Sequence, residues 1–385
     1  MINFLSYLAF FLFSLGQLGR VMLNQGQVNF YFYEISSFLL FILFFFKLGF
    51  QPFQQTLTKF RIIYYFVFFL IFSFLLKAFD FSINQNAISL LYLMRLIFYF
   101  VFPLYLYFFI KKNPGYKETL KKGLTASIFL VAAFSIAQYF FYPDLRNLYY
   151  LGWDPHLNRL FSVFFDTSVA ASIFGLIFFY LYKNKRYWLS LPFLIFLILT
   201  FSRSAYIFFA ITFLVDLFFH KNIKPALLIL LLSISVFTLA PKQFGFGVGL
   251  DRVFSISSRI ADYQKGIAMW QKSPLFGHGY NRLAYIKEKM NLKEIPKENF
   301  PIHSAASLSG SFLIILAASG LIGLILFVLS FIKLVFFNKN AFVYMLFLGL
   351  MSLTDNIILH PFILFLLGVI YVVSLPSGKS RLESK

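Results

Sequence analysis

The chain alternates long runs of apolar residues with short polar connections. A helix needs about 20 mostly apolar residues to cross the hydrocarbon layer of a bilayer. The runs approach this length, and they predict about twelve membrane-spanning helices near 3–19, 30–46, 61–78, 88–110, 122–142, 166–182, 187–201, 204–219, 224–240, 309–332, 341–356 and 358–375. The predicted fold class is therefore all-α, a polytopic membrane protein.

Composition supports this interpretation. Apolar residues make up 60% of the 385 positions and charged residues 12%, whereas a soluble domain carries about 25% charged residues. So few charges could not cover the surface of a soluble fold of this length. The chain has no Cys, which excludes disulfides, thiolate nucleophiles and Cys-based metal sites.

Lys and Arg are distributed unequally between the two alternating sets of connections. One set and the chain end hold Lys47, Lys59, Arg61, Lys111, Lys112, Lys117, Lys121, Lys122, Lys183, Lys185, Arg186, Lys221, Lys224, Lys333, Lys339, Lys379, Arg381 and Lys385. The short connections of the other set hold Arg20, Lys77, Arg146, Arg159 and Arg203. Basic residues concentrate on the cytoplasmic side, so both termini are predicted to be cytoplasmic. The net charge of +20 reflects this topology rather than nucleic-acid binding.

Residues 241–308 form one long connection, predicted to be extracytoplasmic, between the ninth and tenth spans. Loops this long are uncommon unless they have a function. Two helices are expected within it, over 257–272 and 281–293.

Four arginines on the predicted outer side are candidates for binding an anion. Arg203 follows Ser202 in the tight connection between two short spans, where it either snorkels to the surface or faces an inner cavity. Arg252 and Arg259 flank a run of serines at the start of a loop helix, a combination that suits phosphate oxygens. Arg159 precedes Asp166, and the two either pair or line the same cavity.

Charged residues also lie in or near other predicted spans, namely Glu34, Arg95 and Asp216. Such residues are either functional or paired between helices.

Two histidines of the long loop are further candidates. His278 lies between Gly277 and Gly279, in a turn whose backbone N–H groups are expected to approach a ligand closely. His303 comes just before the tenth span, and a neutral imidazole can accept a proton from a sugar hydroxyl. The sequence contains no Walker A loop, HExxH or Asp-x-Asp pair. We therefore expect no metal and no cofactor, and chemistry that depends on arginine.

The order of these motifs resembles the O-antigen ligase and O-antigen polymerase superfamily of bacterial envelopes. Ser202-Arg203 lies between two spans; Ser258-Arg259, Trp270, the stretch 274–280 and His303 follow in the long loop; Ser319-Gly320-Leu321-Ile322-Gly323 lies in the next span. The resemblance covers about 155–335, between N-terminal helices (1–154) and C-terminal helices with a short tail (336–385). One departure concerns His303, which stands farther from Gly320 than the family's histidine does and lacks the following Asn. If the family's spacing to Gly320 is applied strictly, Ser309 occupies the position of the family's histidine.

The resemblance implies an all-helical membrane glycosyltransferase of the bacterial inner membrane. Such an enzyme moves a glycan from undecaprenyl diphosphate to an acceptor on the outer face of that membrane, as in lipopolysaccharide biosynthesis. It implies no metal and no nucleotide sugar. Arg203 and Arg259 would bind the diphosphate, His303 would act on the acceptor, and residues 277–279 would match the family's Gly-x-Gly.

Two alternatives remain open. A ligase uses a lipid A-core sugar as acceptor, whereas an O-antigen or exopolysaccharide polymerase uses a second carrier-linked glycan; the single dominant loop favours a ligase. The alternative from a different class is a twelve-helix secondary transporter, which would place its site near the bilayer midplane.

Overall fold

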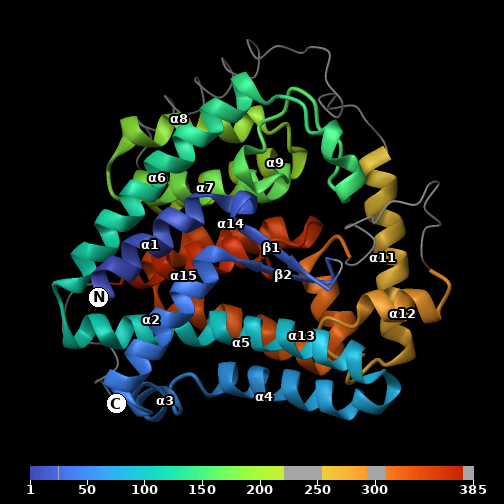
Figure 1. The fold of residues 1–385 in the computed structure, drawn as a ribbon. Coiled ribbons are helices and arrows are strands. Elements are labelled where there is room, and N and C mark those ends of the chain that lie inside the picture. Colours follow the sequence, from blue (N-terminus) through green and yellow to red (C-terminus); the bar gives the residue numbers. More distant parts are fainter. Residues whose placement is uncertain (25, 221–253, 293–307, 376–385) are drawn as a thin grey trace.

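The computed structural model describes residues 1–24, 26–220, 254–292 and 308–375. Most helices run side by side, and one long helix crosses their ends (Figure 1). The helices are α1 (Ile2–Ser14), α2 (Phe32–Leu48), α3 (Gln51–Thr56), α4 (Arg61–Leu76), α5 (Ile83–Lys112), α6 (Tyr116–Phe141), α7 (Thr167–Lys183), α8 (Tyr187–Leu199), α9 (Arg203–His220), α11 (Phe254–Lys272), α12 (Leu283–Lys289), α13 (Ser311–Phe337), α14 (Phe342–Thr354) and α15 (Pro361–Val373).

These helices agree with the expected spans. Each span predicted within the described residues coincides with a helix, and the span near 224–240 lies outside them. By length and apolar composition, α5, α6 and α13 are able to cross a membrane, and α1, α4, α7, α8, α14 and α15 are shorter apolar helices. The mostly helical fold is therefore confirmed, whereas the number of crossings stays a prediction.

A small β-hairpin departs from the all-helical expectation. Strands β1 (Arg20–Leu23) and β2 (Val28–Tyr31) pair antiparallel, with Arg20 opposite Tyr31. Asn24 and Gly26, at the turn, have positive φ angles of 50° and 82°, which Asn and Gly adopt most readily. Long apolar runs do not reveal such a short element.

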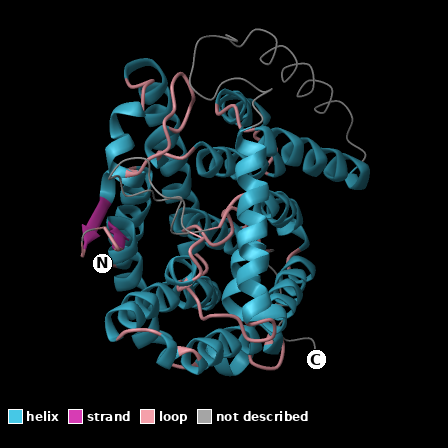
Figure 2. Ribbon diagram, turned by 90° about the vertical axis from the view of Figure 1, so that its right-hand side faces the viewer, coloured by secondary structure: helices cyan, strands magenta, loops and turns pink. Residues whose placement is uncertain are grey.

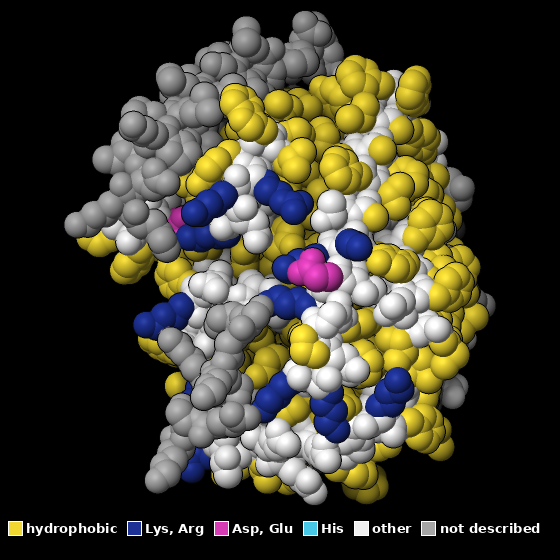
Figure 3. Space-filling view, turned by 90° about the vertical axis from the view of Figure 1, so that its left-hand side faces the viewer, with side chains coloured by type: hydrophobic (Ala, Val, Ile, Leu, Met, Phe, Trp, Pro, Cys, Tyr) yellow, Lys and Arg dark blue, Asp and Glu magenta, His cyan; other side chains and the backbone are white. Residues whose placement is uncertain are grey.

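The basic side chains gather on one face of the molecule (Figure 3). This basic face carries the ends of α2, α5 and α7 and the starts of α4 and α6, with Lys47, Arg61, Lys111, Lys112, Lys117, Lys121, Lys122 and Lys183. The chain after α15 reaches the same face, where the ammonium of Lys117 donates to the carbonyl of Leu375 at 2.6 Å. The basic residues of one set of connections thus lie together on one face, and the orientation of the chain in a membrane stays a prediction.

The face opposite the basic face is crossed by α11 (Figure 2). The helix runs perpendicular to most of the bundle at the right-hand edge of Figure 1, next to α12. The hairpin lies toward the same end of the bundle. We call this end of the molecule the α11 face, and the sequence analysis predicts that it is extracytoplasmic.

The buried apolar side chains form two clusters. The larger cluster joins α1, α2, α6, α7, α8, α9, α14 and α15 to the second half of α5. The smaller cluster joins α4, α12 and α13 to the first half of α5, with Met269 of α11. Aromatic rings supply much of both clusters, which explains the large number of Phe residues in the chain.

Candidate active site at the α11 face

The carboxylate of Asp355, in the link between α14 and α15, joins four separate segments. The Arg259 Nη2 atom of α11 lies 2.9 Å from Asp355 Oδ1 and 3.0 Å from Oδ2. The hydroxyls of Ser168, near the start of α7, and Ser204, near the start of α9, each donate to the carboxylate at 3.1 Å. Thr354 adds a hydrogen bond of 2.8 Å. A charged side chain with this many partners fixes the relative positions of all four segments.

Arg203 is the first residue of α9 and immediately precedes Ser204. Because Ser204 contacts Asp355, the backbone of Arg203 lies at the carboxylate that pairs with Arg259. The fold therefore brings the start of α9, where Arg203 lies, close to the Arg259–Asp355 ion pair, although a long loop separates the two arginines in the sequence. Arg203 is partly buried. Two guanidinium groups near the N-terminus of a helix suit an anion with several oxygens.

Arg159 holds the turn before Arg203 in place. The side chain is 5% exposed. Its Nε donates to the carbonyl of Thr200 at 2.9 Å, and its Nη2 donates to the carbonyl of Phe201 at 3.2 Å and to the hydroxyl of Thr167 at 2.9 Å. Phe201 has a positive φ of 50°, an unfavourable conformation for a bulky residue. Arg159 thus stabilises the strained turn by donating hydrogen bonds to its backbone carbonyls.

Asp166 caps α7 beside this turn. Its Oδ1 accepts hydrogen bonds from the backbone N–H groups of Ser168 and Val169 at 2.7 and 2.9 Å. A side-chain acceptor at this position satisfies donors that the first helical turn leaves unpaired. The cap fixes Ser168 next to Asp355. Asp166 therefore contributes to the site through the start of α7.

Three residues of α11 face the rest of the site from successive turns. Arg259 is followed three and four positions later by Asp262 and Tyr263, a spacing that places all three on one side of a helix. Asp262 accepts a hydrogen bond of 2.6 Å from the hydroxyl of Ser309. The Tyr263 hydroxyl donates to the carbonyl of Leu353. Ser309 is the residue that strict family spacing aligns with a histidine, and here it contacts a carboxylate.

The glycine turn packs against a break in α13. Gly320 has φ 67° and ψ −170°, which interrupts the helix. The N–H groups of His278 and Gly279 donate to the carbonyls of Ala317 and Ala318 at 3.2 and 2.8 Å. A Cβ atom at Gly277 would lie 2.4 Å from the Ala318 carbonyl group. The backbone N–H groups that were expected to bind a ligand therefore donate to α13 instead. Glycine is required at position 277 because a larger residue would clash with α13.

His278 has its own role in this packing. The side chain is 8% exposed, and its Nε2 lies 2.8 Å from the carbonyl oxygen of Met269. Burial lowers the pKa of His278, and the hydrogen bond to Met269 opposes this effect. The imidazole is therefore neutral at pH 7 and links the turn to α11.

Arg282 and Asp355 are the main residues that the sequence analysis missed. Arg282 is fully buried; it donates to the carbonyl of Phe74 at 2.8 Å and to Asn86 at 2.5 Å. Its guanidinium lies 3.7 Å from the ring centre of Phe74, and burial lowers its pKa to about 10. Arg282 was hidden among the loop's many basic residues. Asp355 could have been found as a carboxylate at the end of a predicted span.

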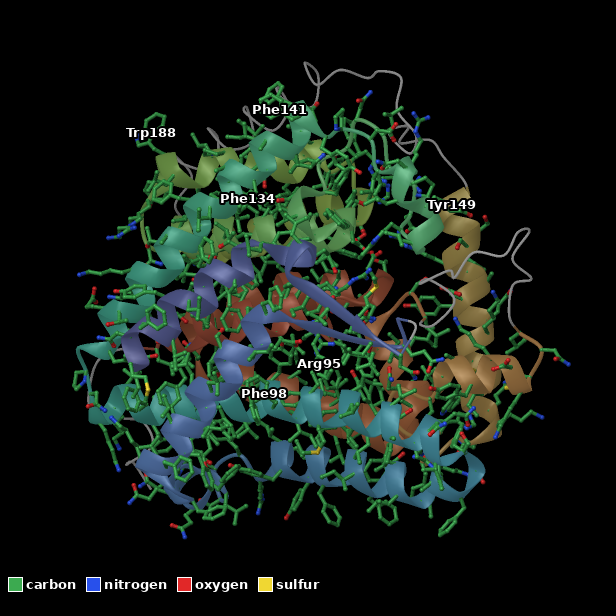
Figure 4. All side chains as sticks on the ribbon, in the orientation of Figure 1. Arg95, Phe98, Phe134, Phe141, Tyr149 and Trp188 are labelled. Atoms are coloured by element: carbon green, nitrogen blue, oxygen red, sulfur yellow. The ribbon has the colours of Figure 1, made fainter. Side chains whose placement is uncertain are left out.

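Other charges inside the helices are paired. Arg95 of α5 donates through Nε to Glu34 of α2 at 2.6 Å, and Tyr99 donates to the same carboxylate at 2.5 Å. Figure 4 shows Arg95 inside the fold, whereas Phe141 and Trp188 project from its rim. Lys183 pairs with Asp216 at 2.5 Å. Pairing between helices, one of the two interpretations of these charges, is confirmed.

Two predicted site residues, Arg252 and His303, lie outside the described residues. Within the described residues, no group of three or more His, Asp or Glu side chains is arranged to hold a metal ion.

The fold and this site define a polytopic helical membrane protein with an arginine-rich centre at one end of the bundle. Residues 188–328 match the family model described as O-Antigen ligase. This match supports the resemblance to the O-antigen ligase superfamily and, in general terms, glycosyl transfer of the ligase or polymerase type. No curated protein matches the chain. The matched stretch includes Arg203, Arg259 and the glycine turn but not Asp355.

Proposed function

We propose that this protein transfers a glycan from an undecaprenyl diphosphate carrier to an acceptor sugar on the outer face of the bacterial inner membrane. The acceptor is a lipid A-core sugar, as in an O-antigen ligase. The α11 face is the outer face, and both termini are cytoplasmic. The distribution of basic residues supports this orientation, because cytoplasmic connections of membrane proteins are enriched in Lys and Arg.

The observation that carries the proposal is the Arg259–Asp355 ion pair, which lies at the start of α9 through the hydrogen bond from Ser204, the residue after Arg203. The leaving group of the donor is a lipid diphosphate, which gains negative charge as it departs. Arginines held in advance in a partly buried site stabilise such charge without reorganisation. In the absence of donor, Asp355 provides the counter-charge for Arg259.

The reaction is a single displacement. The acceptor hydroxyl oxygen forms a bond to the anomeric carbon while the bond from that carbon to the diphosphate oxygen breaks. The electron pair of this bond leaves with the diphosphate, and the hydroxyl proton passes to a base. His303 is the proposed base, and Asp262 beside Ser309 is the second candidate. Direct displacement inverts the configuration at the anomeric carbon.

Arg159, Arg252 and residues 277–279 are proposed to shape the binding site. Arg159 acts through the turn that carries Arg203. The packing of Gly277 and Gly279 on α13 fixes the loop beyond α11. Arg252 is proposed to contact the diphosphate from the loop that precedes α11.

The reaction is proposed to need no metal, because the arginines supply the positive charge that a metal supplies in other transferases. Transfer by the purified protein should therefore continue in EDTA. Loss of transfer in EDTA that one divalent metal restores would show a metal-assisted mechanism instead.

The central test uses purified protein, a polyprenyl diphosphate-linked glycan and a lipid A-core acceptor. Arg203→Ala should abolish transfer while the protein still accumulates in the membrane. Arg203→Lys should lose most activity, since an ammonium cannot bind two oxygens in a plane. The matched control is Arg146→Ala, which removes an exposed arginine paired with Asp144. Full activity of Arg203→Ala would exclude the proposed role.

The same assay separates the alternative functions. A polymerase elongates the carrier-linked glycan when no lipid A-core is present, whereas a ligase requires the second acceptor. A secondary transporter forms no glycosidic product in detergent under either condition.

A further inference from the structure

An apolar cavity lies between the two clusters of buried side chains, away from the α11 face. Its volume is about 350 Å³, within the range of small-molecule sites. The walls come from α4 and α13 on one side and from α5 and α15 on the other. These are the helices in the lower half of Figure 1. The cavity therefore lies between the α4–α13 pair and the helices α5 and α15.

Aromatic rings line both ends of the cavity. At one end, the rings of Phe100 and Phe327 both contact Phe66, with centres 5.9 and 5.3 Å away. At the other end, Phe60 and Phe337 lie 4.8 Å apart. The second pair lies where α4 begins and α13 ends, which is the basic face. The cavity thus extends along the helices from the middle of the bundle to the basic face.

The lining offers few polar groups to a ligand. Most of the lining hydroxyls have a hydrogen-bond partner in the protein: Thr56 with Tyr64, Tyr99 with Glu34, Ser330 with the Ile62 carbonyl, and Tyr371 with the Leu334 carbonyl. Water and sugars need such groups, so the cavity suits a hydrocarbon chain. An empty apolar cavity destabilises a fold in proportion to its volume, which favours an occupant.

Basic side chains surround the end of the cavity at the basic face. Arg61 follows the lining residue Phe60 at the start of α4. Lys112, at the end of α5, donates to Gln51 of α3 at 2.9 Å, two residues before the lining residue Phe53. The ammonium of Lys59 lies 5.6 Å from the ring centre of Phe337. An anionic headgroup is therefore complementary to this end.

We propose that the cavity binds one acyl chain of an anionic glycerophospholipid from the membrane leaflet next to the basic face. The headgroup phosphate lies near Arg61 and Lys112, and the chain extends between α4 and α5 toward Phe327. The bound acyl chain fills the space between the two apolar clusters. It thereby supports α13, whose break at Gly320 packs against the glycine turn at 277–279. This lipid site is distinct from the site for the glycan donor.

The test compares two neighbouring substitutions in the full chain, purified in detergent and freed of lipid. Val67→Trp fills the cavity, because Val67 lines it. Phe68→Trp is the matched control, because Phe68 is 69% exposed on the same helix. Each protein is titrated with palmitoyl-oleoyl phosphatidylglycerol or with phosphatidylcholine carrying the same chains. Native mass spectrometry measures the bound lipid, and Tm measures its effect.

The wild type and Phe68→Trp should bind phosphatidylglycerol with at least about fivefold preference over phosphatidylcholine, and binding should raise Tm. Val67→Trp should lose this binding and this rise. Arg61→Gln should reduce the preference about fivefold and still bind lipid. Equal binding by Val67→Trp and the wild type would overturn the proposal. So would a lipid co-purified from native membranes that proved to be a polyprenyl phosphate.

A second measurement uses the wild type alone, so it is independent of how the variants fold. Phosphatidylglycerol with a photoreactive group in its acyl chain should label peptides that contain lining residues of α4 and α15, such as Val67 and Leu367. Labelling confined to exposed positions such as Phe68 would overturn the proposal.

Discussion

Arg259 of α11 and Asp355 of the α14–α15 link form an ion pair across 96 residues of sequence, with Nη2–Oδ distances of 2.9 and 3.0 Å. The same carboxylate accepts hydrogen bonds from Ser168 and Ser204. Asp355 therefore holds Arg259 close to the start of α9, where Arg203 lies. In the proposed reaction, the donor diphosphate competes with Asp355 for Arg259, and the carboxylate still orients the guanidinium.

The first prediction concerns this carboxylate. Asp355→Asn preserves the size of the side chain and removes its charge. We expect kcat to fall about 10- to 100-fold, because a preorganised arginine loses the group that orients it. KM for the donor should not rise, because the carboxylate no longer competes with the diphosphate. Steady-state kinetics with varied donor concentration measure both values.

The matched control for Asp355 is Asp80→Asn, which removes an exposed carboxylate 3.8 Å from Lys77. This control should behave like the wild type. A higher donor KM in Asp355→Asn with an unchanged kcat would contradict the orienting role.

The second prediction distinguishes a positioning role of Arg159 from direct substrate binding. Arg159→Ala leaves the carbonyls of Thr200 and Phe201 without their buried donors, and each unsatisfied buried group costs about 1–3 kcal/mol. We expect Tm to fall by several degrees and kcat to fall with it. Thermal unfolding in detergent and donor kinetics on the same preparation check this expectation.

Arg146→Ala is again the control, since this arginine is exposed and lies in the same connection. If Arg159 instead bound the donor, KM would rise while Tm stayed at the wild-type value.

Much of the helical fold could be predicted from the sequence, because each helix is encoded locally. The apolar runs mark helices such as α5 and α13, and their positions agree with the structure. The Lys and Arg residues of one set of connections lie together on the basic face, although α11 and α12 also carry basic residues. The hairpin at Arg20–Tyr31 was missed, since strands of four residues are too short to give a clear apolar pattern.

The candidate site was harder to predict, because it depends on contacts between distant segments. Arg203 and Arg259 were singled out by their neighbours in the sequence, but Asp355, which pairs with Arg259 and bonds to Ser204 next to Arg203, was not. No local pattern connects a carboxylate after α14 with serines that begin α7 and α9. The packing role of Gly277 was equally hidden, because it depends on the break at Gly320 in another helix.

The third prediction concerns this glycine packing. A Cβ atom at Gly320 would lie 2.3 Å from the carbonyl group of Leu275, and one at Gly277 would lie 2.4 Å from that of Ala318. Both glycines also have positive φ angles of 67° and 68°, which cost an alanine roughly 1–2 kcal/mol even without a clash. We expect Gly320→Ala and Gly277→Ala each to lower Tm by several degrees and to reduce transfer.

Gly115→Ala serves as the control, because a Cβ atom there has no neighbour within 4 Å and φ is −61°. Wild-type Tm values for both Gly320→Ala and Gly277→Ala would show that the turn does not depend on this contact.

The last prediction identifies the base for the acceptor hydroxyl. If His303 is the base, His303→Ala should lower turnover about 10²–10⁴-fold while donor binding stays near the wild-type value. His278→Ala should act differently. Its imidazole is buried against the Met269 carbonyl, so its removal should lower Tm and reduce turnover only as far as the loop loosens.

Substitutions of Asp262 and Ser309 test whether Asp262, the second candidate, is the base. Their hydrogen bond of 2.6 Å places a carboxylate where family spacing would put a histidine. If Asp262 is the base, Asp262→Asn should cause the large loss of turnover and His303→Ala should not. Ser309→Ala should cause a smaller loss in that case, since the hydroxyl only orients the carboxylate.

Single-turnover measurements with bound donor separate these outcomes, because they report the chemical step without product release. A His303→Ala protein that retains wild-type single-turnover rates would exclude the histidine, whatever the other variants show. If only His303→Ala has a reduced single-turnover rate, His303 is the base. The extra residues between His303 and α13 are then an insertion relative to the family.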